Sequence, residues 1–166
     1  MGHFAASNES MQKVRKEFNN VCSENLTKDD LTLSKLDFLK KHATWQTSQD
    51  MPYLDHTLKE VLRVMPPVSN STEFTLERDS TVGKYHIKAG DIVHVNITGL
   101  HRHPDQWQKP KEFRPERFDS TDPFYLTPSG KKRNTMSFCP FMSGKRACFG
   151  KTFAEATLKI MGIYMS

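Results

Sequence analysis

Long apolar stretches are missing from this chain. No run approaches the roughly 20 apolar residues that cross a bilayer, and residues 1–4 are not a basic segment followed by an apolar one. We therefore expect neither a transmembrane helix nor a signal peptide within this sequence. Internal repeats and low-complexity tracts are missing as well, which argues against a repeat architecture.

Cysteine is scarce, with three residues at irregular spacing: Cys22, Cys139 and Cys148. An odd number without a regular pattern excludes a disulfide framework, and no C-x-x-C pair indicates zinc. The thiols are therefore expected in, or facing, a reducing compartment. Cys22 falls near the end of a predicted helix, where packing is its expected role.

The composition is typical of one soluble globular domain. The 166 residues are 36% hydrophobic and 26% charged, and a chain of this length can bury a sizeable core. The net charge is +5, with one denser basic stretch at residues 131–133. Since aromatic residues do not alternate with the basic ones, we interpret this charge as solvated surface and expect no nucleic-acid partner.

Two amphipathic helices are expected before residue 48. Apolar residues at helical spacing indicate the first: Met11, Val14, Phe18 and Val21. After a polar break at residues 25–28, Asp29 or Asp30 is expected to cap a second, shorter helix. Its apolar side would be formed by Leu33, Leu36 and Leu39.

A third helix is predicted to start at Pro52, which suits a first helical turn, and to stop at Pro66 and Pro67. One apolar stripe runs along it, formed by Leu54, Leu58, Leu62 and Met65. Glu60 and Arg63 are three residues apart, so they share a helical face and can form an ion pair.

Short strands are expected in the middle of the chain. Residues 73–76 and 84–87 are the first two candidates, with a turn after the second. Residues 93–98 then alternate apolar with polar side chains, as in a half-buried strand. We interpret His86 and His94 as structural strand residues rather than ligands.

From residue 101 to 137 the chain becomes irregular, and long loops of this kind are usually functional or wrap a scaffold. Residues 101–104 form the start of this segment, and we interpret them as a turn that has no chemical role. A last helix is expected from about Gly150. Its apolar side would contain Phe153, Ala154, Thr157, Leu158 and Met161.

The segment FMSGKRACFG, residues 141–150, carries the strongest chemical signal. Cys148 precedes a helix, where free backbone N–H groups and the dipole favour an anion, here the metal-binding thiolate. Gly144 and Gly150 would permit a tight bend and the close approach of a flat cofactor, and Arg146 offers its charge to a carboxylate such as a heme propionate. One thiolate fits heme better than zinc. A buried free cysteine beside two turn glycines is the alternative.

This segment matches the pattern F-x-x-G-x-R-x-C-x-G at every fixed position, and the chain thereby resembles the cytochrome P450 superfamily. The fixed positions are Phe141, Gly144, Arg146, Cys148 and Gly150. The resemblance implies that Cys148 is the axial ligand of a heme iron and that the other four residues bind the heme. Cys139 lies outside the pattern and is not expected to be a second ligand.

Two further motifs occur in the family's order. Glu60 and Arg63 resemble its E-x-x-R helix motif, and FRPERF, with Arg117, resembles its P-E-R-F element. The resemblance implies a buried triad of these three residues that locks the irregular segment against the helix and holds the cysteine in place. The chain departs at Glu73, where the family often has Arg or His, so Arg146 is the one residue expected at a propionate.

The implied fold is mainly α with a small β sheet, the C-terminal part of the cytochrome P450 fold, and residues 1–166 would be one partial domain. Its expected parts are a helical segment (3–48), the E-x-x-R helix (49–67), a β region (68–100), a meander loop (101–140) and the heme-ligand loop with the final helix (141–166). His3 to Phe18 resembles the helix that follows the family's long oxygen-activating helix. That long helix and the β segment after the last helix are not in this sequence, so the chain would supply the proximal ligand and little of the distal pocket.

By resemblance, the function is that of a monooxygenase that inserts one oxygen atom of O2 into a small organic substrate. A reductase or ferredoxin-like protein would supply electrons, and Lys145 and Lys151 would dock this acidic partner or be ordinary surface lysines. The parent protein is expected at the cytoplasmic side of the endoplasmic reticulum membrane, attached only through a segment outside this sequence, with mitochondria as the alternative. A heme-binding module without turnover, or a remnant that does not fold alone, are the other hypotheses.

Overall fold

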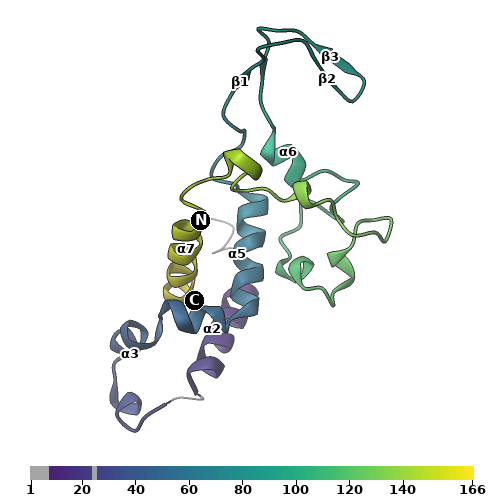
Figure 1. Ribbon diagram of the computed structural model, residues 1–166. Helices are drawn as coiled ribbons and strands as arrows, with labels where there is room; N and C mark the ends of the chain where they lie inside the picture. The colour runs from purple at the N-terminus through teal and green to yellow at the C-terminus, as the bar shows by residue number, and fades with distance from the viewer. Residues whose placement is uncertain (1–7, 24–25) are drawn as a thin grey trace.

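The computed structural model describes residues 8–23 and 26–166 (Figure 1). Two helices stand side by side at its centre, α5 (Pro52–Val64) and α7 (Lys151–Met165), and α2 (Asn8–Ser23) packs against both. The strands lie at the opposite end of α5 from α2. No helix of these residues is long and apolar enough to cross a membrane.

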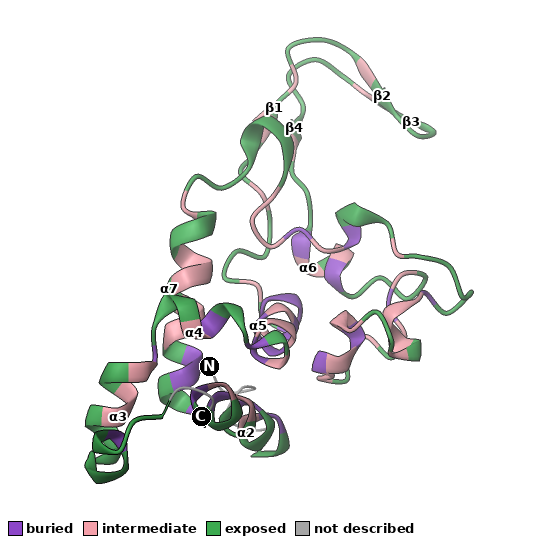
Figure 2. Ribbon diagram, turned by 60° about the horizontal axis from the view of Figure 1, so that its bottom comes forward, coloured by how far each residue is buried: buried purple, intermediate pink, exposed green. Residues whose placement is uncertain are grey.

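The core lies where α2, α5, α7 and the short α4 (Trp45–Gln49) meet, as the buried residues in Figure 2 show. The first predicted helix is confirmed, because α2 buries Val14 and Phe18; its expected start near His3 lies outside the described residues. The third is confirmed as α5, which has Pro52 in its first turn. Met65 is 44% exposed, so its place on the buried stripe was wrong, since the helix ends at Val64.

The second predicted helix begins later than expected. Residues Asp29–Thr32 form a 3-10 turn, η1, and α3 (Lys35–His42) starts after Ser34, whose side chain accepts a hydrogen bond from the N–H of Asp37. The Asp30 carboxylate, the predicted cap, instead accepts hydrogen bonds from Thr27 and Lys41. Ser34 therefore caps the helix, and the Asp30 carboxylate is bound by other partners.

The β region forms two separate antiparallel pairs. Strand β1 (Phe74–Thr75) pairs with β4 (Ile92–Val93), and β2 (Ser80–Val82) pairs with β3 (Tyr85–Ile87). The strand predicted over residues 93–98 was wrong beyond Val93, so His94 is not a strand residue. Asn96 accepts a hydrogen bond from the N–H of Gly99 and so caps a short helix, α6 (Ile97–His101). Capping at Asn96 outweighs the alternation of apolar and polar residues.

The segment between α6 and α7 is irregular, as expected. It contains four 3-10 turns, which are η2 (Pro115–Phe118), η3 (Pro123–Tyr125), η4 (Thr135–Ser137) and η5 (Gly144–Arg146). The turn η2 packs against α5. An irregular chain therefore covers one side of the central helix.

The packing face of α7 agrees only in part with the predicted one, since Leu158 packs against the core. Gly162 and Ile163 are its buried residues, whereas Phe153, Thr157 and Met161 are exposed. A Cβ atom at Gly162 would lie 2.8 Å from Leu54 Cδ1, so this glycine lets α7 approach α5 closely. The predicted apolar side did not include Ile163, and Gly162 carries no hydrophobic signal that could have marked the close approach.

Replacing Gly162 by Ala should lower the free energy of unfolding by about 1–2 kcal/mol, because overpacking against Leu54 outweighs the better helix propensity of alanine. Urea unfolding measures the effect. Thr157→Ala, on the exposed side of the same helix, is the control and should change stability by less than about 0.5 kcal/mol. A more stable Gly162→Ala protein would contradict the close approach of the two helices.

Candidate functional site

One carboxylate and two guanidinium groups are buried together beside α5. Glu60, Arg63 and Arg117 are each 0% exposed. Arg63 donates hydrogen bonds to both carboxylate oxygens of Glu60, at 2.7 and 2.9 Å, and Arg117 Nε donates to Oε1 at 3.0 Å. The backbone N–H of Arg114 donates to the same oxygen at 2.7 Å. The structure thus brings together the three residues that the two motifs single out.

Backbone carbonyls of the irregular segment compensate the second positive charge. One carboxylate neutralises only one guanidinium, so the other needs additional acceptors in a buried place. Arg63 and Arg117 donate to carbonyl oxygens at 2.8 to 3.1 Å, those of His101, Gln108, Pro110 and Glu112. Burial lowers the pKa of Arg117, and Glu60 opposes this shift. The irregular segment is therefore fixed to α5 through its main chain.

Arg133 ties the later part of the irregular segment to the same place. It donates hydrogen bonds to the carbonyls of Phe124 and Arg117, both at 2.8 Å. Its Cζ lies 4.4 Å from the ring centre of Trp107, a buried side chain that Arg63 also approaches. Burial lowers the pKa of Arg133 to about 10, so it stays charged at neutral pH. For this arginine, the interpretation of residues 131–133 as solvated surface was wrong.

The cysteine loop, residues 139–150, connects the irregular segment with α7. The N–H of Cys148 donates to the carbonyl of Phe141 at 2.8 Å, and the N–H of Met142 donates to the carbonyl of Cys139 at 3.0 Å. Gly144 has a φ of +66°, in the left-handed region that glycine adopts without strain. The bend expected at Gly144 is therefore present.

Gly150 lies in a tight turn, in which the N–H of Lys151 donates to the carbonyl of Cys148 at 3.3 Å. Its φ is −81°, which any residue adopts, so this turn does not itself require glycine. A Cβ atom at Gly150 would lie 3.9 Å from Cys148 Sγ. Glycine at this position therefore keeps space beside the thiol at the start of α7.

Cys148 is exposed, whereas Cys22 and Cys139 are buried. The two phenylalanines that follow it are exposed as well, Phe149 completely and Phe153 by 78%. Large exposed aromatic side chains of this kind are typical of a surface that another group covers. The expected alternative of a buried thiol at position 148 does not hold.

The residues present fit heme. Among the described residues, no group of three or more His, Cys, Asp or Glu side chains is arranged to hold a metal ion, whereas a heme iron can be held by one cysteine of the protein. Cys148 would be that ligand, with Phe149 and Phe153 as apolar contacts. Arg146 is exposed on the same loop and would offer its charge to a propionate.

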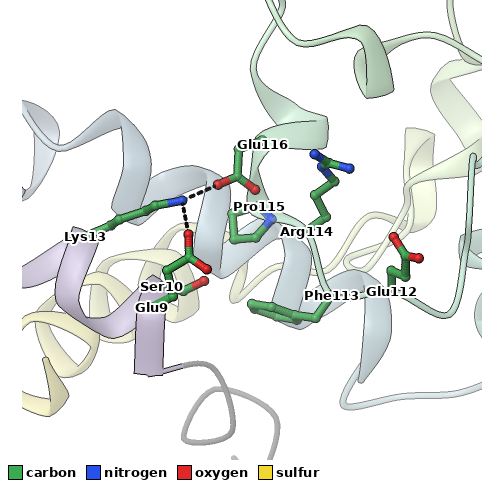
Figure 3. Close-up of a pocket in the computed structure, with 8 residues that line it drawn as sticks. All are labelled: Glu9, Ser10, Lys13, Glu112, Phe113, Arg114, Pro115 and Glu116. Atoms are coloured by element: carbon green, nitrogen blue, oxygen red, sulfur yellow. Dashed lines mark hydrogen bonds and ion pairs between the residues drawn. The ribbon is translucent and has the colours of Figure 1, made fainter.

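A pocket lies elsewhere, between α2 and η2 (Figure 3). It has a volume of about 330 Å³, and Lys13 bridges Glu9 and Glu116 across it at 2.8 and 2.9 Å. None of its lining residues belongs to the cysteine loop. The candidate site is therefore the exposed loop and not this pocket.

Sequence reasoning missed His101, which it placed in a turn without chemistry. The side chain is 0% exposed, and its Nε2 atom accepts a hydrogen bond from the N–H of Cys139 at 3.0 Å. Its carbonyl accepts from Arg63. His101 thus lies between the buried charges and the cysteine loop, and no sequence pattern indicates a contact with a distant backbone N–H.

The fold and the exposed thiol of Cys148 are compatible with a heme-thiolate class of protein, and comparison with known proteins identifies the family. Residues 2–165 match the family model described as Cytochrome P450. Cytochrome P450 2J5 of Mus musculus is 35% identical over 73% of this chain and 23% of its own length. (+)-Menthofuran synthase of Mentha piperita is 39% identical over 66% of this chain and 21% of its own length.

A solved structure has the same fold. Retinoic acid bound cyanobacterial CYP120A1 superposes with a TM-score of 0.71 and 28% identity, covering 96% of this chain and 31% of the other. The chain belongs to the cytochrome P450 family, whose cofactor is heme. It spans about a quarter of the length of the curated relatives it matches.

Replacing Glu60 by Gln should lower the free energy of unfolding by about 3–5 kcal/mol, because two guanidinium groups would lose their buried counter-charge. Urea unfolding again measures the effect. Lys59→Ala is the control, since it removes a partly exposed ion pair with Asp55 from the same helix. That change should cost less than about 1 kcal/mol, and equal losses for both variants would contradict a special role of the buried carboxylate.

Acid pH should destabilise the protein through His101. Burial lowers its pKa from 6.5 to about 4, helped by the charge of Arg63 and opposed by backbone carbonyls of Arg63 and Leu62. The folded state therefore binds fewer protons, so the contribution is complete above about pH 6.5 and is lost as pH falls towards 4.

The loss should reach roughly 3 kcal/mol at most. Unfolding free energies at pH 7.5 and pH 5 measure it, with His101→Gln as a variant that cannot titrate. The variant should show the shallower pH dependence, and identical slopes would contradict the assignment.

Proposed function

We propose that this chain is the heme-binding part of a monooxygenase that inserts one oxygen atom of O2 into a small organic substrate, with Cys148 as the proximal thiolate ligand. The observation that carries the proposal is the exposed thiol of Cys148 just before α7, with the exposed side chains of Phe149 and Phe153 close by in the chain. Membership of the cytochrome P450 family supports it.

The residues of the loop have separate tasks in this proposal. Cys148 would ligate the iron through its sulfur, and the hydrogen bond from its N–H to the carbonyl of Phe141 fixes the backbone at that position. Gly144 provides the bend, Gly150 leaves space beside the sulfur, and Arg146 offers its charge to a propionate. When bound, a thiolate-ligated heme supplies the chemistry that cleaves the O–O bond.

Electrons would come from a reductase or ferredoxin-like protein. Lys145 and Lys151 are both exposed on the cysteine loop and the first turn of α7, where they would attract an acidic partner. The parent protein would act at the cytoplasmic side of the endoplasmic reticulum membrane, with a mitochondrial location as the alternative. Membrane contact would come from a segment outside this sequence.

A heme-binding module without turnover is the second candidate. It concerns this segment alone, which spans about a quarter of the relatives' length. The family's oxygen-activating helix and most of the substrate pocket lie outside the matching part. Heme uptake without substrate oxidation would select this candidate.

The reduced carbon monoxide difference spectrum tests the ligand. We expect heme added to the chain to give the long-wavelength Soret band of thiolate ligation, because Cys148 is exposed for coordination. Cys148→Ser should abolish this band, since an alcohol is a poor ligand for heme iron.

Cys22→Ala provides the matched control, because this cysteine is buried on α2 and away from the loop. The control should keep the long-wavelength band. A long-wavelength band that survives in Cys148→Ser would overturn the assignment of Cys148 as the ligand. Heme uptake by the wild-type chain without this band would leave only the heme-binding module without turnover.

A further inference from the structure

We propose that His101 is a positioning residue for the cysteine loop, whose Nε2 atom holds the N–H of Cys139 and so ties the loop to the C-terminal end of α5. This inference deepens the proposed function and rests on it, because the loop matters through the ligand that it carries.

The contact is completely enclosed. His101 is the last residue of α6 and is 0% exposed, and Cys139 is 4% exposed. The Nε2 atom accepts the N–H of Cys139 at 3.0 Å, and the imidazole ring lies 5.2 Å from the ring of Phe138. A buried N–H that loses its acceptor costs free energy, so this hydrogen bond constrains where the loop begins.

Residues of α5 and its surroundings hold His101 itself in place. Arg63 donates to the carbonyl of His101 at 3.0 Å, and Arg102, the next residue, donates to the carbonyl of Val64 at 2.7 Å. The indole N–H of Trp107 donates to the carbonyl of Leu100 at 3.1 Å. The end of α6 is therefore fixed to the end of α5, and the histidine side chain reaches from there to the loop.

The environment keeps the side chain of His101 neutral, which is the form whose Nε2 atom can accept a hydrogen bond. Because Nε2 accepts a hydrogen bond, the proton of the neutral ring must be on Nδ1. That atom is buried and has no hydrogen-bond partner among the described residues, while carbonyls of Arg63 and Leu62 face the ring. Burial holds the pKa of His101 at about 4, so at neutral pH Nε2 remains available to Cys139.

The constraint reaches Cys148 through two further hydrogen bonds. The carbonyl of Cys139 accepts the N–H of Met142 at 3.0 Å, and the carbonyl of Phe141 accepts the N–H of Cys148 at 2.8 Å. A shift of Cys139 to find another acceptor would therefore move residues 139–142, which hold the backbone of the ligand. The expected consequence is a poorly placed thiolate and not a lost fold.

Two substitutions test the hydrogen-bond acceptor of His101 separately from its aromatic ring. His101→Phe keeps a ring beside Phe138 and removes the acceptor, whereas His101→Gln loses the ring and places an amide oxygen near the position of Nε2. In the full-length, heme-loaded protein, we expect His101→Phe to lower the ratio of thiolate-type to thiol-type carbon monoxide complex by about five-fold. His101→Gln should restore most of this ratio.

A variant of similar stability controls for general loosening. Ile97 is buried on the same short helix, so Ile97→Ala should destabilise the protein while leaving the Cys139 contact in place. At matched melting temperature its ratio should stay near that of the wild type. An equal fall in Ile97→Ala, or no rescue by His101→Gln, overturns the inference.

A second readout needs no heme and separates this inference from the proposed function. Trypsin cleaves after Arg133, Lys145 and Arg146, so Cys139 and Cys148 fall in different peptides. In the heme-free full-length protein, a thiol reagent should label Cys139 about five-fold faster in His101→Phe and at the wild-type rate in His101→Gln. An unchanged labelling rate of Cys139 in His101→Phe overturns the role of His101. If both variants are labelled at the expected rates but the wild-type protein shows no thiolate band, the proposed function alone is overturned.

Discussion

Two arginine side chains share one buried carboxylate, and the order of the surrounding chain depends on this arrangement. Glu60 neutralises a single charge, so Arg63 and Arg117 need carbonyl oxygens from the irregular segment to complete their hydrogen bonds. The segment has few regular backbone hydrogen bonds of its own. The two guanidinium groups donate to backbone carbonyls that a helix or sheet would otherwise satisfy. A charge pair that costs free energy to bury is thus stabilised by the chain that it orders.

The cysteine loop is connected to the same buried charges through His101, whose carbonyl accepts from Arg63. Its buried start contacts His101, and its exposed end presents Cys148 and Phe149. Between them the chain changes direction at Gly144, and α7 then returns along α5, to which Gly162 gives close access. A buried attachment on one side and an exposed thiol on the other would suit a large planar cofactor, because the attachment fixes the backbone and the exposed side leaves the thiol accessible.

Much of the fold could be predicted from the sequence, where the signal is local. The stripe on α5, the amphipathic face of α2 and the irregular character after His101 follow from periodicity and proline. The errors have local causes as well as more distant ones: the cap at Asn96 starts a helix where a strand was expected, and the Asp30 carboxylate binds Thr27 and Lys41 instead of capping a helix. The motifs identified the three residues of the charge network, whereas the role of Cys148 as the ligand stays a prediction. His101 was missed because its partner is a backbone N–H, and main-chain partners leave no trace in the amino-acid pattern.

Hydrogen exchange tests most directly whether the buried charges order the cysteine loop. The full-length protein and its Glu60→Gln variant would be compared peptide by peptide under conditions in which both are folded. The account predicts that residues 101–118 and residues 139–150 lose protection together, while the exposed hairpin of residues 80–87 exchanges as in the wild type. A cysteine loop that keeps its wild-type protection while residues 101–118 lose theirs would contradict the account.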